Sequence, residues 1–339
     1  MRKAVGLLAA LWLAGGVLAG CSLDQNNASS DKGKTKQDGE VKIGLSISTL
    51  NNPFFVTLKE GAEKAAKDEG AELIVVDAQN DSAKQINDIE DLIQQKVDVL
   101  LVNPTDSSAV TSAIESANSA NIPVITVDRS ADGGKVVTHI ASDNVAGGKM
   151  AAQFIVDHLK NGGNIVELEG IPGSSAARER GEGFHQVIDK AANMKVVAKQ
   201  AADFDRAKGL SVMENILQSH KDIQAVFAHN DEMALGALEA LQAHGMNNVI
   251  VVGFDATDDA VKAVKEGKMA ATVAQKPALI GEKAVEAAIR VHKGEKVDKL
   301  SPFRLNWFRG NNDWKREEGV SKTQRDTLFG FLLNRFTIL

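Results

Sequence analysis

The chain of 339 residues has little cysteine, few aromatic residues and no excess of positive charge. The shortages of cysteine and of positive charge each exclude a class of protein. A single cysteine excludes a disulfide framework and any metal site built from several cysteines. Lys and Arg number 39 against 45 Asp and Glu, and this net charge of −6 argues against a nucleic-acid binder. Tyrosine is absent, and there are only 12 Phe and 3 Trp. Hydrophobic residues make up 43% and charged residues 25%, as in a globular protein, and the length predicts about two domains.

Residues 1–20 are predicted to form a secretory leader rather than part of the fold. Arg2 and Lys3 precede an apolar stretch that is too short and too abruptly ended for a membrane-spanning helix. The stretch ends in Leu18-Ala19-Gly20-Cys21, which resembles the lipobox of bacterial lipoproteins. We therefore expect lipidation of Cys21 and a new N-terminus at that residue. A plain leader with an incidental cysteine is the alternative.

Residues 21–40 are predicted to be a lipid-anchored, flexible tether. Residues 22–40 contain one large apolar side chain, that of Leu23. Such a segment cannot bury enough surface to compensate for the entropy of ordering it. We therefore expect the folded body to lie outside the cytoplasm, attached to the cell membrane through its lipid.

From residue 41 onward the chain alternates apolar segments with amphipathic ones. Apolar runs rich in Val and Ile predict strands at 41–48, 71–78, 97–104, 123–129, 164–170, 194–200, 224–230 and 249–255, with a short run at 136–142 between two halves. Nearly continuous apolar strands are typical of parallel sheets covered by helices on both faces. Intervening segments such as 83–95 and 231–244 have helical patterns. The sequence therefore predicts an α/β fold with two doubly wound parallel sheets.

Polar and aromatic side chains follow the predicted strands. In open parallel sheets, ligands bind beyond the carboxyl ends of the strands. The residues at these places are Asn52, Phe54, Phe55, Asn103, Asp128, Arg129, Phe204, Asn230, Asp255 and Gln275. Carboxylates, amides and arginine bind hydroxyl groups, and phenyl faces cover C–H groups, so the set suits a neutral polyhydroxylated ligand. No nucleophile–base pair, metal-ligand spacing or phosphate-binding glycine motif occurs in the sequence, so we expect no enzyme activity, no cofactor and no metal.

Simpler interpretations exist for the candidates of the first half. Phe54 and Phe55 could be core residues in the first turn of a helix, and Asn103 could belong to a turn. Asp128 could be a solvated loop charge. The prediction of a site therefore depends on the joint position of these residues at strand ends.

The candidates of the second half could be helix caps. We expect Asp231 to cap the helix that follows and Asn230 not to do so. Asp255 could cap a helix that begins near Thr257. Gln275, which precedes Lys276 and a proline, carries little information by itself.

Eight segments together resemble the D-ribose-binding proteins of bacterial ABC importers. They are STLNNPFF (48–55), VNPTD (102–106), IPVITVDR (122–129), HIASDN (139–144), AARERGEGF (176–184), ADFDR (202–206), NDEMALG (230–236) and VGFD (252–255). The similarity extends from about residue 41 to residue 300. It implies a type I periplasmic-binding-protein-like fold, in which two α/β lobes are joined by three crossing strands. Lobe 1 would comprise 41–142 plus 276–304, and lobe 2 would comprise 143–275.

The resemblance also implies a set of sugar contacts. The residues expected to form hydrogen bonds with the sugar are Asn52, Asp128, Arg129, Arg180, Asn230, Asp255 and Gln275. Phe54, Phe55 and Phe204 would enclose the sugar ring, and Asn103 would lie near the sugar or the hinge. Arg180 rather than Arg178 matches the family contact, and Arg178 could be an ordinary surface charge.

The function implied by the resemblance is capture of D-ribose, or a similar sugar, by closure of the two lobes and delivery to an ABC permease. A chemoreceptor is a second partner to consider, nucleic acid is not a partner, and a monomer is expected. A sugar-responsive repressor shares the core but would carry an N-terminal helix-turn-helix where this chain has a leader and tether. Another pentose, a hexose or a furanose-like signalling molecule is the alternative ligand.

The end of the chain differs in composition from the rest. Residues 303–339 contain five Phe, two Trp and five Arg, whereas residues 21–302 contain seven Phe, no Trp and five Arg. A frameshift in the gene near Leu300 would explain this change, and a genuine divergent extension is the alternative. We therefore treat 305–339 as an anomalous tail, which puts the third crossing strand in doubt.

Overall fold

The computed structural model describes residues 40–309. The predicted leader, Cys21, the tether up to residue 39 and the tail beyond residue 309 lie outside the described residues. Within 40–309, no helix has both the length and the apolar character needed to cross a lipid bilayer.

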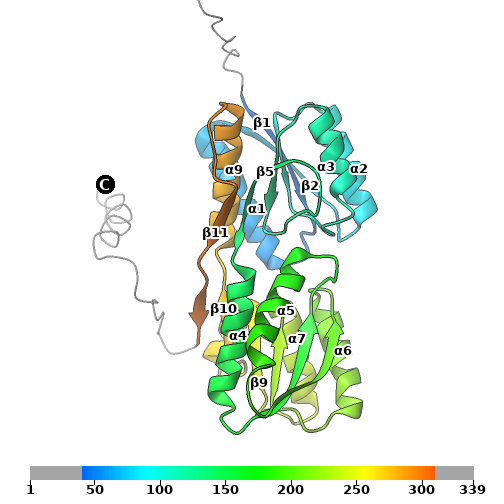
Figure 1. The fold of residues 1–339 in the computed structure, drawn as a ribbon, viewed down its shortest axis with the longest axis vertical. Helices are drawn as coiled ribbons and strands as arrows, with labels where there is room; N and C mark the ends of the chain where they lie inside the picture. The colour runs from blue at the N-terminus through cyan, green and yellow to red at the C-terminus, as the bar shows by residue number, and fades with distance from the viewer. Residues whose placement is uncertain (1–39, 310–339) are drawn as a thin grey trace, which may run out of the picture. The chain divides into compact units, whose positions relative to one another are not determined.

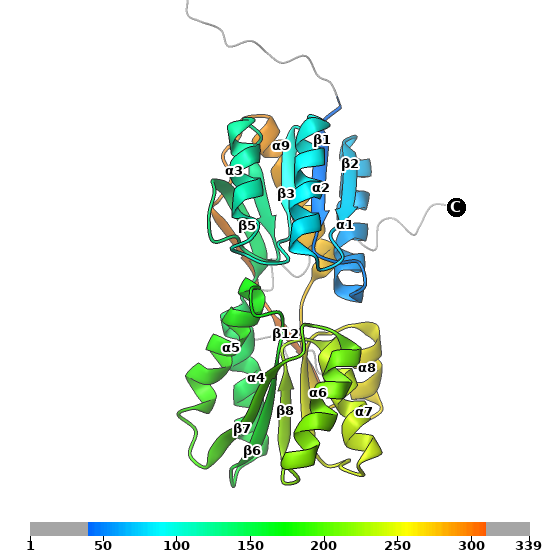
Figure 2. The same cartoon turned by 90° about the vertical axis from the view of Figure 1, so that its right-hand side faces the viewer.

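Two six-stranded sheets form the centres of two lobes (Figures 1 and 2). The sheet of lobe 1 has the order β11-β5-β4-β3-β1-β2 and is parallel throughout. Its strands are β1 (Lys42–Ile47), β2 (Glu72–Asp77), β3 (Val99–Val102), β4 (Val124–Val127), β5 (Val136–Ser142) and β11 (Leu300–Phe303). Its helices are α1 (Pro53–Glu69), α2 (Ser82–Gln94), α3 (Thr111–Ser119) and α9 (Pro277–His292).

The sheet of lobe 2 has the order β12-β10-β9-β8-β6-β7 and is parallel except for β12, which is antiparallel to β10. Its strands are β6 (Gly163–Glu169), β7 (Met194–Ala201), β8 (Ala225–Ala228), β9 (Ile250–Asp255), β10 (Ala271–Ala274) and β12 (Asn306–Phe308). Its helices are α4 (Asn144–His158), α5 (Ser175–Ile188), α6 (Arg206–Ser219), α7 (Asp231–Ala243) and α8 (Asp258–Lys265).

Strand β3 shows why these apolar runs form buried sheets. Val99 and Leu101 belong to the cluster beneath α1 and α9, whereas Leu100 and Val102 belong to the cluster beneath α2 and α3. Successive side chains of a strand point to opposite faces, so a strand covered on both faces must be apolar at every position. All four of these side chains are buried, as the sequence pattern predicts.

The chain passes between the two sheets at three places (Figure 1). The first crossing leads from β5 to α4, and the second leads from β10 to α9. The third crossing joins β11, which pairs with β5, to β12, which pairs with β10. Two doubly wound lobes with three crossing segments confirm the predicted fold class.

The third crossing is formed by residues whose composition is unusual for this chain. Trp307 pairs with Val273 in the second sheet, and its ring centroid lies 5.1 Å from that of Phe154. Leu305 also packs against the cluster that contains Phe154 and Phe254. Residues 305–308 therefore contribute to the packing of lobe 2.

The prediction that Asp231 rather than Asn230 caps the helix after β8 is wrong. Asn230 is the N-cap of α7, because its backbone is extended and its Oδ1 accepts a hydrogen bond from the backbone N–H of Met233 at 3.0 Å. Asp231 is the first residue of α7, and its buried carboxylate accepts hydrogen bonds from Thr257 and Thr272 instead. Asp255 caps no helix, since Thr257 occupies the N-cap position of α8.

Candidate functional site

A small cavity lies where the carboxyl ends of the strands of both lobes meet. About 230 Å³ of space, part of it open to solvent, is lined by Asn52, Phe54, Phe55, Asp128, Arg129, Ala176, Arg180, Phe204, Asn230, Asp255 and Gln275. Every residue that the sequence predicts for the site, except Asn103, is in this lining. Lobe 1 and lobe 2 therefore each supply residues to the lining of one shared space.

The first turn of α1 provides one wall of the cavity. Asn52 is the N-cap of this helix, and its Oδ1 accepts a hydrogen bond from the backbone N–H of Phe54 at 2.9 Å. Pro53 in the first turn suits a helix start because its ring fixes φ and its missing N–H is not needed there. The rings of Phe54 and Phe55 meet edge to face with centroids 5.2 Å apart. Both rings belong to the core of lobe 1 and also line the cavity. Phe54 and Phe55 are therefore core residues of the first turn of α1 and candidate site residues at the same time.

Asp128 and Arg129 follow β4 and are both 3% exposed. Asp128 has a φ of 64°, in the left-handed region that non-glycine residues rarely adopt. Asp128 Oδ2 lies 3.8 Å from Arg129 Nε, while Asp128 Oδ1 and Arg129 Nε have no hydrogen-bond partner among the described residues. Arg129 Nη1 donates to the carbonyl of Pro104 at 3.3 Å. Because buried polar atoms without partners are costly, Asp128 Oδ1 and Arg129 Nε offer this side of the cavity an acceptor and a donor for a ligand.

Two phenyl rings enclose the guanidinium of Arg129. The carbon Cζ of Arg129 lies 5.0 Å from the centroid of Phe55 in lobe 1 and 5.1 Å from that of Phe204 in lobe 2. These distances are within the range of cation–π attraction. Burial lowers the pKa of Arg129 to about 10, so the side chain remains charged at neutral pH.

Arg180 extends from α5 into the lobe 2 side of the cavity. Its Nε donates to Asn144 Oδ1 at 2.9 Å, and its Nη1 donates to the backbone oxygen of His229 at 2.6 Å. The same Nη1 lies 3.7 Å from Asp255 Oδ1. With two hydrogen bonds to neutral protein acceptors, the guanidinium is fixed in direction and keeps other N–H groups for a ligand.

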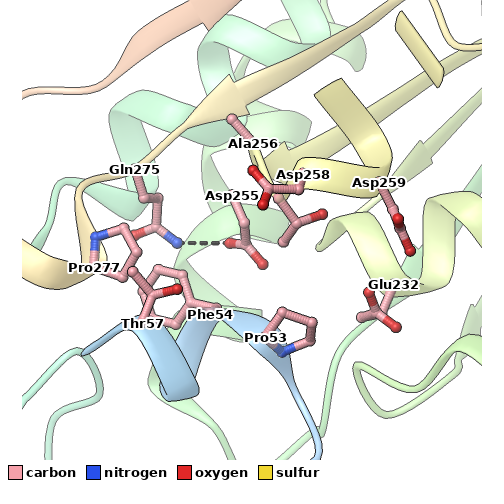
Figure 3. Close-up of a pocket in the computed structure, with 11 residues that line it drawn as sticks. Pro53, Phe54, Thr57, Glu232, Asp255, Ala256, Asp258, Asp259, Gln275 and Pro277 are labelled. Atoms are coloured by element: carbon pink, nitrogen blue, oxygen red, sulfur yellow. Dashed lines mark hydrogen bonds between the residues drawn. The ribbon is translucent and has the colours of Figure 1, made fainter. Parts of the chain in front are cut away.

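Asp255 is placed at the end of β9 by an uncommon backbone conformation with a φ of 118°. Its Oδ1 accepts a hydrogen bond from Gln275 Nε2 at 2.7 Å, which Figure 3 shows as a dashed line. Gln275 lies just after β10 at the second crossing, so this contact joins the hinge to the site. Gln275 Oε1 has no partner among the described residues.

Burial and neighbouring positive charges shift the pKa values of the two carboxyl groups of the cavity in opposite directions. Burial raises the pKa of Asp128 above its ordinary value, and the charges of Arg129 and Arg180 offset part of that rise. Burial also raises the pKa of Asp255 well above its ordinary value, and the charge of Arg180 lowers it only in part. Hydrogen bonds donated by ligand hydroxyl groups would stabilise both carboxylates.

A larger hollow of about 870 Å³, open to solvent, adjoins the cavity at Phe54, Asp255 and Gln275 (Figure 3). Its other charged side chains are the carboxylates of Glu232, Asp258 and Asp259. Neither arginine of the small cavity lines it. The matched donors, acceptors and rings therefore line the small cavity rather than the adjoining hollow.

Comparison with known proteins agrees with this geometry. Residues 43–296 match the model of the family described as "Periplasmic binding protein domain". The chain belongs to this family. It is 58% identical over 309 residues to the ribose import binding protein RbsB of Bacillus subtilis, covering 90% of this chain and 99% of that protein. It is 57% identical over 263 residues to the RbsB protein of Escherichia coli, covering 78% of this chain and 88% of that protein.

A solved structure from this family has the same fold. The ABC transporter solute binding protein of Bacillus halodurans, crystallised with bound myo-inositol, is 36% identical to this chain and superposes with a TM-score of 0.78. The match covers 82% of this chain and 97% of that protein. Members of this family are extracytoplasmic substrate-binding proteins of ABC transporters.

Asn103 is the predicted site residue that the structure places outside the cavity lining. It is fully buried, and its Oδ1 accepts hydrogen bonds from the backbone N–H of Ser48 at 3.1 Å and from the Ser48 hydroxyl at 2.7 Å. Its Nδ2 donates to the carbonyl of Val127 at 3.0 Å, next to Asp128. Asn103 therefore joins the ends of β1, β3 and β4 behind the site.

The cavity lining also includes Ala176, which no pattern in the sequence predicts. A small apolar residue near the start of a helix has no chemical signal, although Ala176 lies within the AARERGEGF segment. Its small side chain leaves room in the cavity beside Arg180.

Direct contacts between the lobes lie beside the cavity. The Ser107 N–H donates to the Gly173 carbonyl at 2.9 Å, and the Ser130 N–H donates to Ser175 Oγ at 2.9 Å. Arg178 Nη2 lies 3.1 Å from Asp132 Oδ1, so this half-exposed arginine bridges the lobes. The lobes thus contact each other around the cavity, as in a closed form of the protein.

Proposed function

We propose that this protein is an extracytoplasmic substrate-binding protein that captures D-ribose between its two lobes and delivers it to an ABC permease. The observation that carries the proposal is the cavity, which lies between the two lobes and is lined by two buried aspartates, two buried arginines and three phenyl rings. Identity of 57–58% to ribose import binding proteins supports ribose as the sugar.

Each class of side chain has a defined role in this proposal. Asp128 and Asp255 accept hydrogen bonds from sugar hydroxyl groups, and Arg129 and Arg180 donate to sugar oxygens. The amides of Asn52, Asn230 and Gln275 complete the polar contacts. Phe54, Phe55 and Phe204 cover the C–H faces of the ring.

Closure of the lobes follows from where these groups lie. A ligand shifts an equilibrium between open and closed forms only by its difference in affinity for them. Asp128 and Arg129 belong to lobe 1, whereas Arg180 and Asp255 belong to lobe 2. A sugar that contacts both sets binds the closed form more tightly, and the three crossing segments permit the rocking motion.

The proposal includes binding and release of an unchanged sugar rather than a reaction. In the cavity, the carboxylates lie beside arginines or amides rather than beside a nucleophile. The part of the chain between residues 40 and 309 contains no cluster of His, Cys, Asp and Glu that could bind a metal ion.

We further propose the organisation of the whole chain. Residues 1–20 would be removed as a leader, Cys21 would carry the lipid, and residues 21–40 would tether the lobes to the membrane. Lobe 1 would comprise 41–142 plus 276–304, and lobe 2 would comprise 143–275 together with β12. The protein would act as a monomer and deliver the sugar to the permease. A chemoreceptor would be a second partner.

A thermal-shift screen of the purified protein tests the choice of sugar. The panel contains D-ribose, other pentoses, hexoses and myo-inositol, the last because a relative of similar fold was crystallised with it. Because a ligand that binds only the folded state raises the melting temperature, D-ribose is expected to give the largest rise. A larger rise with another member of the panel would overturn ribose as the substrate.

A further inference from the structure

A buried carboxylate and a buried imidazole lie directly behind the lobe 2 side of the cavity. Glu167 is on β6 and His229 follows β8, and both residues are fully buried. His229 Nε2 lies 3.0 Å from Glu167 Oε1. Neither residue lines the cavity. Burial of a charge is costly, so this pair calls for an explanation beyond the sugar contacts described above.

Hydrogen bonds at both ring nitrogens fix the orientation of the imidazole. The backbone N–H of Gly170 can only donate, and it points to His229 Nδ1 at 3.4 Å. Nδ1 is therefore the acceptor, and Nε2 carries the proton that is donated to Glu167. Burial raises the pKa of Glu167, but its hydrogen bond with His229 and the positive charge of its neighbours bring this pKa below its ordinary value. The acceptor is thus an ionised carboxylate.

The fixed histidine contacts two parts of the proposed sugar site. Its backbone oxygen accepts the 2.6 Å hydrogen bond from Arg180 Nη1. Its Nδ1 accepts the hydrogen bond from the backbone N–H of Gly170. The ring of Phe204 packs against Gly170 so closely that a Cβ added to this glycine would lie 2.0 Å from Phe204 Cζ. One imidazole therefore connects the ends of β6 and β8 to a charged side chain and an aromatic ring of the cavity.

The helix that carries Arg180 packs over the same pair. A Cβ placed on Gly181 would lie 3.3 Å from His229 Cε1 and 3.4 Å from Glu167 Oε1. The middle of α5, next to Arg180, is therefore in close contact with both members of the pair, so a shift of the imidazole would move Arg180 through its backbone as well as through its hydrogen bond.

We propose that His229, held by Glu167, is a positioning residue that sets the direction of Arg180 and the place of Phe204 in the lobe 2 half of the sugar site. The inference rests on the proposed sugar-binding function and adds to it residues that never touch the ligand. Binding site geometry depends on such supporting hydrogen bonds, because small displacements of directional donors weaken binding.

His185 provides a matched control on the opposite side of Glu167. Its Nε2 lies 2.8 Å from Glu167 Oε2, and its Nδ1 lies 2.9 Å from Asp189 Oδ1. This histidine is partly exposed and forms no hydrogen bond to Arg180 or Gly170. Replacing it changes the surroundings of Glu167 without removing the connection to the cavity.

The test is isothermal titration calorimetry with D-ribose on three variants, together with thermal melting without sugar. His229→Phe keeps a buried ring but loses the hydrogen bonds to Glu167 and Gly170, and its Kd is expected to rise about tenfold or more. His229→Gln can still donate to Glu167 and is expected to recover most of the affinity. His185→Gln is expected to stay within about twofold of the wild type.

Two results would overturn the inference. The first is a His229→Phe protein that melts at a lower temperature yet binds ribose as tightly as the wild type, which would give His229 a merely structural role. The second is a His185→Gln protein that loses as much affinity as His229→Phe. Should His229→Phe fail to fold, His229→Asn is measured in its place. The asparagine amide is too short to reach Glu167, so this variant is expected to lose as much affinity for ribose. Failure of the wild type to bind ribose would instead contradict the proposed function.

Discussion

The guanidinium carbon of Arg180 lies 3.8 Å from the ring centroid of Phe254. Phe254 is fully buried on β9, directly before Asp255, so the ring and the carboxylate of one strand end fix the arginine from two sides. Cation–π attraction and stacking suit the planar guanidinium better than an ammonium group. The lobe 2 half of the cavity therefore depends on an arginine in particular rather than on any positive charge.

Arg180→Lys is predicted to weaken ribose binding about tenfold or more, because an ammonium group lacks the planar, forked donor geometry with which the guanidinium bonds to Asn144 and His229, packs against Phe254 and presents further N–H groups to a sugar. Isothermal titration calorimetry measures the change. The control is Arg178→Lys, two residues earlier in α5, which alters only the half-exposed contacts to Gly173 and Asp132. Exposed ion pairs contribute about 0–1 kcal/mol, so the control is expected to lose less than about fivefold. Equal losses in the two variants would contradict the assignment.

Asp128→Ala and Asp255→Ala are each predicted to weaken ribose binding about tenfold or more. Each removes a buried acceptor for sugar hydroxyl groups, and leaving a buried polar group unpaired costs about 1–3 kcal/mol. Asp258→Ala is the matched control, because Asp258 lines only the adjoining hollow. Unchanged titrations for both cavity variants, or a loss of similar size in Asp258→Ala, would contradict the placement of the site.

Ending the chain after Arg304 is predicted to destabilise the protein relative to a chain that ends after Arg309. The shorter chain loses β12 and the packing of Leu305 and Trp307 against lobe 2. Loss of large apolar side chains from a packed cluster costs about 2–5 kcal/mol, so its melting temperature is expected to fall clearly. Equal melting temperatures for the two truncated chains would show that β12 contributes nothing to stability.

Cys21→Ser is predicted to release the protein from the membrane. The thiol is the group that the proposed lipid attaches to, and serine cannot replace it. Cell fractionation followed by immunoblotting is the measurement, with the wild type expected in the membrane fraction and the variant in the soluble extracytoplasmic fraction. The same distribution for both proteins would argue for a plain leader and an incidental cysteine.

Most of the cavity could be predicted because the parallel-sheet fold brings strand ends together. Asp128, Asn230 and Asp255 each follow an apolar run by one or two residues, which is a signal in the sequence itself. Asn103 follows a strand in the same way but turns inward to bond Ser48 and Val127. The sequence contains no signal for which way such a side chain turns.

Other features depend on contacts that a local pattern does not contain. Asn230 rather than Asp231 became the cap because Asp231 has buried partners on β10 and before α8, far away in the chain. Glu167 and His229 are 62 residues apart, and each interrupts an apolar run without any periodic signal. β12 forms in a segment of unusual composition, because strand pairing uses backbone groups and tolerates aromatic side chains.

The most direct test of the central claim is isothermal titration calorimetry of the purified protein with D-ribose. A polyhydroxylated ligand enclosed from both lobes is expected to bind at one site per chain with a Kd of about 1 µM or tighter, which is within the affinity that ligands of this size reach. The absence of any binding at about 1 mM ribose, corresponding to a free energy weaker than about −4 kcal/mol, would contradict the account.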